Sequence, residues 1–99
     1  MTPRERTEVL AAVAALHATG AERLSVNDVS GVLDMRQEFF WWTETFAELE
    51  SDGVVQRTGA LSPGGFEVSG EDMMAVAWES GRVRFRLTVE GYVELWGPR

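Results

Sequence analysis

The stretch that decides the fold is MRQEFFWWTETFAELESDGVVQR, residues 35–57. Four aromatic residues follow one another at 39–42, and a helix cannot turn four consecutive side chains to the same side. At about 100° per residue one apolar stripe with 4-3-4-3 spacing emerges, made of Met35, Phe39, Trp42, Phe46 and Leu49. The stripe predicts a helix that buries these five residues and turns Phe40 and Trp41 outward.

The outer face of this helix combines aromatic and acidic side chains. Gln37, Glu44 and Glu48 are the neighbours of Phe40 and Trp41 on the same helical wheel. Exposed aromatic residues bordered by charges are typical of a protein interface. We therefore expect these five residues to form a protein-binding face.

A second interpretation of the two rings stays open. A segment elsewhere in the chain can fold over Phe40 and Trp41 and make them part of the monomer's own interior. The candidates are residues 59–80 and the C-terminal segment that carries Tyr92 and Trp96.

Composition limits the class of protein. The chain has 99 residues, of which 44% are hydrophobic, and this fits a single small domain. It has no cysteine, so a disulfide framework and a thiolate metal site are excluded. No apolar run approaches the ~20 residues that a membrane span needs. The N-terminal MTPRERTEVL is too charged for a signal peptide, so we expect a cytoplasmic protein without a membrane contact.

The acidic charge is concentrated in one third of the chain. Residues 22–53 carry two arginines and eight acids, which accounts for −6 of the net charge of −7. Affinity for a phosphate backbone comes largely from cationic contacts, so this distribution disfavours nucleic acid as a partner.

Two helices are expected before the aromatic stretch. TPRE at 2–5 has a capping threonine, a proline at the first helical position and a glutamate that completes a capping box. The helix that follows is expected to end at Gly20. A second, short helix is expected after Ser25, and Asp34 with Gln37 predicts a capping box for the third helix.

Strand patterns follow the third helix. VVQRT at 54–58 and RVRFRLT at 82–88 predict two strands, with a short one at 66–68 between them. The intervening residues, about 59–80, exceed what a simple hairpin needs. Residues 71–80, EDMMAVAWES, fit either a helix capped by Gly81 or a hairpin strand. The segment TVEGYVELWGP at 88–98 predicts a short terminal helix.

The order of these elements resembles a winged helix-turn-helix domain of the kind found in prokaryotic regulators. LSVNDVSGVLDM at 24–35 resembles the family's second helix and turn. LESDGVVQR at 49–57 resembles the end of its recognition helix and the first wing strand, and RLTVEGYVEL at 86–95 the passage into a C-terminal helix. The resemblance implies one α+β domain over residues 1–99. It would comprise a three-helix bundle, a two- or three-stranded β wing with an insertion at about 59–80, and a short C-terminal helix.

The third helix departs from the family's DNA-binding pattern. In DNA-binding members its outer face offers polar and basic groups to the major groove. Here it offers Phe40, Trp41, Glu44 and Glu48, with only Arg36 nearby.

The arginines are the best argument for nucleic acid. Alternation in RVRFRLT places Arg82, Arg84 and Arg86 on one face, and Arg57 on the neighbouring strand is expected to join them. Together with Arg36 they are the candidate nucleic-acid contacts. The other interpretation is a solvated strand face paired with glutamates.

Catalytic and cofactor sites are not expected. His17 is the only histidine and has no second histidine or cysteine to complete a metal site. The acid pairs, such as Glu71 with Asp72, lack convergent partners. The sequence therefore predicts a non-enzymatic regulator or adaptor that acts through protein contacts, with self-association included. The alternative is a small DNA-binding transcriptional regulator that uses an arginine-lined wing.

Overall fold

The computed structural model describes residues 1–20, 24–33, 38–78 and 81–97. Helix α1 spans Pro3–Ala18 and begins with the expected capping box, in which Thr2 Oγ1 accepts from the Glu5 amide and a Glu5 carboxylate oxygen accepts from the Thr2 amide. Gly20 follows its C-terminal cap with a φ of 87°, a conformation that glycine adopts without strain. Helix α2 spans Val26–Val32 and has a capping box of its own, between Ser25 and Asp28.

Helix α3 spans Phe39–Ser51 and is the central helix of the core. Its N-terminal cap is Glu38, whose backbone is extended. The helix therefore begins later than the expected capping box of Asp34 and Gln37, and residues 34–37 lie outside the described part of the chain. Its last turn leads through Gly53, with a φ of 76°, directly into the sheet.

The described strands form a three-stranded antiparallel sheet in the order β2-β1-β3. Strand β1 spans Val55–Leu61, β2 spans Glu67–Val68 and β3 spans Val83–Leu87. The short strand expected at 66–68 is thus confirmed, although it contains only two residues. The β1–β3 register is interrupted between Arg57 and Gly59, where a bulge leaves Thr58 without a cross-strand partner.

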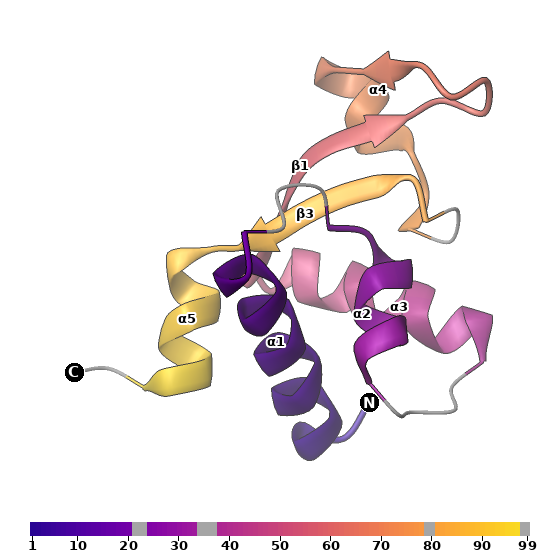
Figure 1. Ribbon diagram of the computed structural model, residues 1–99. Coiled ribbons are helices and arrows are strands. Elements are labelled where there is room, and N and C mark those ends of the chain that lie inside the picture. The colour runs from indigo at the N-terminus through magenta and orange to yellow at the C-terminus, as the bar shows by residue number, and fades with distance from the viewer. Residues whose placement is uncertain (21–23, 34–37, 79–80, 98–99) are drawn as a thin grey trace.

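The segment between β1 and β3 contains both a strand and a helix. After β2, helix α4 spans Gly70–Ala75, so the helical interpretation of this part is confirmed. The helix ends at Ala75 with Val76 as its cap, and the expectation that Gly81 caps it is therefore wrong. Figure 1 shows α4 beside β1 at the end of the sheet that is distant from α1 and α5.

The expected terminal helix is confirmed: α5 spans Val89–Trp96, and Thr88 caps its N-terminus. It packs against α1 and the end of β3 (Figure 1). The approach is close at Gly91, because a Cβ atom there would collide with the backbone oxygen of Val54. Thr88 fixes the same corner, since its hydroxyl donates to the Gly53 carbonyl (2.6 Å) and accepts from the Gly91 amide (3.1 Å).

The core joins the helices to the inner face of the sheet. Phe46 of α3 lies 4.7 Å from Phe85 of β3 and 5.4 Å from Trp78, measured between ring centroids. Val9 and Val13 of α1 are fully buried against the same cluster. The molecule is thus an α+β structure whose layout is compatible with a winged-helix arrangement.

Candidate functional site

The inner face of α3 follows the predicted stripe. Trp42, Phe46 and Leu49 are buried, and the rings of Trp42 and Phe46 stack with centroids 6.4 Å apart. Met35 and the side chain of Phe39, which complete the predicted stripe, lie outside what the structure describes. The helix is therefore rotated about its axis as predicted at these three positions.

The outer face of α3 separates the two remaining rings. Phe40 is 66% exposed, whereas Trp41 is half-buried and packs against the core. The Trp41 ring meets Trp42 edge-on, with centroids 4.9 Å apart and an interplanar angle of 85°. The prediction that both rings face outward is therefore wrong for Trp41, because the first turn of α3 lies close enough to the core for this large ring to reach it.

Acidic and small residues follow Phe40 along the outer face of α3. Glu44 and Glu48 are exposed, as are Ala47 and Ser51. Neither glutamate has an ion pair within the described residues. Gln37, the fifth residue predicted for this face, is outside the described part of the chain.

Neither of the two segments considered as covers removes Phe40 from the surface. Helix α5 packs on α1 and β3, and the segment after α4 sends Trp78 beneath Phe46 and Phe85 in the core. With both segments in place Phe40 keeps two thirds of its surface exposed. We use the term α3 outer face for Phe40, Glu44, Ala47, Glu48 and Ser51.

Two of the candidate arginines lie on the outer face of the sheet, where both have contacts. Arg84 forms an ion pair with Glu67 of β2 (3.1 Å), and its stem lies over Gly59. Arg86 is exposed, and its Nη2 is 3.5 Å from the Gln56 side-chain oxygen. The ion pair confirms the alternative interpretation, glutamate pairing, for Arg84.

The other candidate arginines do not extend this pair. Arg82 is half-buried and lines a hollow of about 350 Å³ together with Asp72 and Val76. Arg36 is outside the described residues. Arg57 pairs in register with Phe85, a buried residue, so it projects from the opposite face of the sheet. The expectation that Arg57 joins Arg84 and Arg86 is therefore wrong.

Arg57 is instead the centre of a buried polar cluster. Its side chain is 6% exposed, and Nε donates to a Glu50 carboxylate oxygen at 2.6 Å. Nη1 donates to the carbonyls of Met73 and Val76, at the end of α4. The guanidinium also lies over the Trp78 ring, 4.9 Å from its centroid, and the Trp78 indole donates to Glu50. All these partners are internal, so the cluster positions the segment after β1.

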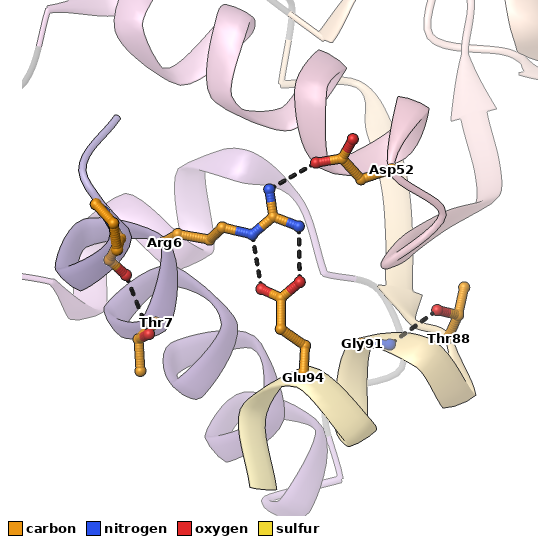
Figure 2. A network of polar contacts seen from close by, with 7 residues as sticks. Arg6, Thr7, Asp52, Thr88, Gly91 and Glu94 are labelled. Atoms are coloured by element: carbon orange, nitrogen blue, oxygen red, sulfur yellow. Dashed lines mark hydrogen bonds and ion pairs between the residues drawn. The ribbon is translucent and has the colours of Figure 1, made fainter. Parts of the chain in front are cut away.

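A second polar cluster joins three helices (Figure 2). Arg6 of α1 forms a two-pronged contact with the Glu94 carboxylate of α5, at 2.6 and 2.7 Å, and a single one with Asp52 after α3, at 2.6 Å. The hydrogen bonds that Arg6 donates to Glu94, and to a lesser extent the one it donates to Asp52, raise the pKa of its guanidinium against the opposing effect of burial. The Arg6 guanidinium therefore stays positively charged, and its ion pairs connect α1 to α5 and to the C-terminal end of α3.

Neither cluster resembles a reactive site. Two carboxylates bind the Arg6 guanidinium, and one carboxylate, two carbonyls and the Trp78 ring bind that of Arg57; the contacts within the described residues bring no nucleophile to either. Among the described residues no group of three or more histidines, cysteines, aspartates or glutamates could hold a metal ion. No helix within these residues is long and apolar enough to cross a membrane.

Sequence reasoning missed an exposed apolar stripe on α5. Val89, Val93 and Trp96 are 76%, 45% and 59% exposed, and they border a shallow hollow of about 370 Å³ together with Tyr92. The signal was present, because these three residues recur at i, i+4 and i+7. From the sequence, the terminal helix was one of two possible covers for Phe40 and Trp41, but in the structure this helix packs on α1 and β3.

Comparisons with known protein families, with curated proteins and with solved structures found no match to the chain.

Proposed function

We propose that this chain is a non-enzymatic, winged-helix-type protein of the cytoplasm that acts as a regulator or adaptor. Its contact with a protein partner would be made by the α3 outer face, with Phe40 as the anchor. The observation that carries the proposal is the 66% exposure of Phe40 on a helix face that includes Glu44 and Glu48. A large exposed ring bordered by charges has the composition of an interface hot spot and its rim.

The arrangement of the arginines argues against the DNA-binding alternative. Arg57 is engaged inside the protein and Arg84 is paired with Glu67, so two of the four described candidates are neutralised by carboxylates. The α3 outer face, which enters the major groove in DNA-binding relatives of this class, would bring Glu44 and Glu48 toward phosphates. The negative carboxylates and the negative phosphates would repel each other, and this repulsion opposes DNA binding.

Site-specific photo-crosslinking in cells tests the proposal. A photoreactive phenylalanine analogue at position 40 is expected to give discrete protein adducts, and the additional change Glu44→Arg with Glu48→Arg should remove them. The same analogue at position 96 is the matched control, because Trp96 is also an aromatic residue with more than half of its surface exposed. Equal adduct patterns from both positions would refute a specific contact at α3.

Two measurements on the purified chain separate the alternatives. Duplex DNA at ~100 mM salt should show no mobility shift, whereas a salt-sensitive shift that Arg84→Ala with Arg86→Ala abolishes would establish the DNA-binding alternative. Light scattering reports self-association. A dimer that Phe40→Ala converts to a folded monomer would identify the partner as a second copy.

A further inference from the structure

The distribution of ion pairs points to the chemistry of the partner. The described arginines with a carboxylate partner include Arg6, which binds Glu94 and Asp52, and Arg57, which binds Glu50. Both draw on acids at the last turn of α3 or just beyond it. Glu44 and Glu48 come earlier in α3, on its outer face, and neither has an ion pair with a cation among the described residues.

The α3 outer face can be approached closely by another chain. Ala47 and Ser51 are small and exposed, and they follow Phe40 on the same helix face, about two and three turns further along the axis. Glu44 and Glu48 are one turn apart, so their side chains are about 6 Å from each other at Cβ. This spacing matches that of two cationic side chains four residues apart on a facing helix.

We infer that the partner segment is a basic amphipathic helix of another protein, which receives Phe40 between its apolar side chains and pairs lysines or arginines with Glu44 and Glu48. This inference rests on the proposed function. The negative charges of Glu44 and Glu48 favour a positively charged partner. A second copy of this chain carries a net charge of −7, and at Arg6, Arg57 and Arg84 it has already paired its own cations.

Selection from a random library of displayed 16-residue peptides on the immobilised full chain tests the inference. The enriched peptides should be basic, with apolar residues at i and i+4. Fluorescence anisotropy then measures each one as a synthetic peptide. Glu44→Gln with Glu48→Gln should weaken binding about tenfold at low salt. Phe40→Ala should weaken it at least tenfold, and binding should weaken further as salt screens the charges.

A control with the same change in net charge distinguishes a local effect from a global one. Glu71→Gln with Asp72→Asn removes two exposed charges from α4 instead, and it should change the affinity less than twofold. Circular dichroism establishes that each variant is folded. Equal weakening by the two double variants would show that general attraction to an acidic protein explains binding, and this would overturn the inference.

The remaining outcomes also decide the question. Enriched peptides that are neutral or acidic but still depend on Phe40 overturn the basic partner and leave the proposed contact face intact. Enrichment of no peptide, or of peptides indifferent to Phe40, overturns the inference, and the crosslinking experiment then decides the proposed function separately. A dimer that depends on Phe40 would make the occupant a second copy and overturn the inference as well.

Discussion

At the scale of single residues, Arg57 determines where the segment after β1 lies. One guanidinium satisfies the Glu50 carboxylate, two carbonyls at the end of α4 and the face of Trp78. The alternation that begins at Val55 already placed Arg57 on the inner face, two residues along the strand. The prediction nevertheless grouped Arg57 with the three arginines of RVRFRLT, because all four are basic residues on neighbouring strands.

Removal of the Arg57 charge should be costly. Arg57→Met leaves the Glu50 carboxylate and two carbonyls without their donor, and we expect a loss of about 2–4 kcal/mol in the free energy of unfolding, measured with urea. The double variant Arg57→Met with Glu50→Gln should recover part of this loss, because no uncompensated charge remains. A loss below ~1 kcal/mol in the free energy of unfolding of the single variant would show that the Arg57 cluster contributes little to stability.

Replacement of His17, unlike that of Arg57, should not destabilise the protein. Its Nε2 atom is buried and, among the described residues, has no hydrogen-bond partner, which is an unfavourable state for a polar atom. His17→Leu removes this atom at similar volume, so we expect an unchanged or higher midpoint of thermal unfolding, with a gain of up to about 1 kcal/mol. His17→Gln, which keeps a polar group at the site, should give no gain. A clear loss of stability in His17→Leu would indicate that the imidazole has an internal partner.

At the scale of elements, the helix starts were only partly predictable from local hydrogen-bonding patterns. Thr2 with Glu5 marks the start of α1 in the sequence and in the structure, whereas α3 begins after Glu38 and not at the capping box expected from Asp34 and Gln37. The partition of Phe40 and Trp41 was only half predictable. A helical wheel gives the direction in which a side chain leaves the axis, but not how far neighbouring packing reaches around the helix.

The close contact of α5 with the backbone of Val54, the residue before β1, depends on the absence of a side chain at Gly91. Gly91→Ala would place a methyl group against the Val54 backbone oxygen and 3.1 Å from the Leu87 side chain, so α5 must shift. We expect a loss of about 1–3 kcal/mol, measured by chemical unfolding.

The matched control is Gly31, a glycine within α2. A Cβ atom at this position would meet nothing within 4 Å, so Gly31→Ala should stabilise the protein by about 0.5 kcal/mol through helix propensity. If both substitutions changed stability in the same direction, the close approach of α5 would not be the cause.

At the scale of the whole molecule, the fold has a shared core and a peripheral end. Phe46 of α3, Trp78 after α4 and Phe85 of β3 pack together, and Trp78 thereby attaches the segment after α4 to the core. This arrangement was not predictable from the sequence, because Trp78 lies in a stretch with both helical and strand patterns. Helix α4 itself has no buried residue. Its position therefore depends on Arg57 and Trp78 at its end.

Hydrogen exchange should resolve these two levels of stability. The Phe85 amide donates to the Leu24 carbonyl within the core, so it should exchange only through global unfolding. The amides of Met74 and Ala75 in α4 should exchange through local opening at a lower free energy, because this helix is short and exposed. Arg57→Met should lower the opening free energy of α4 by more than it lowers that of Phe85. Equal opening free energies for α4 and Phe85 in the unmodified protein would mean that the insertion and the core unfold as a single cooperative unit.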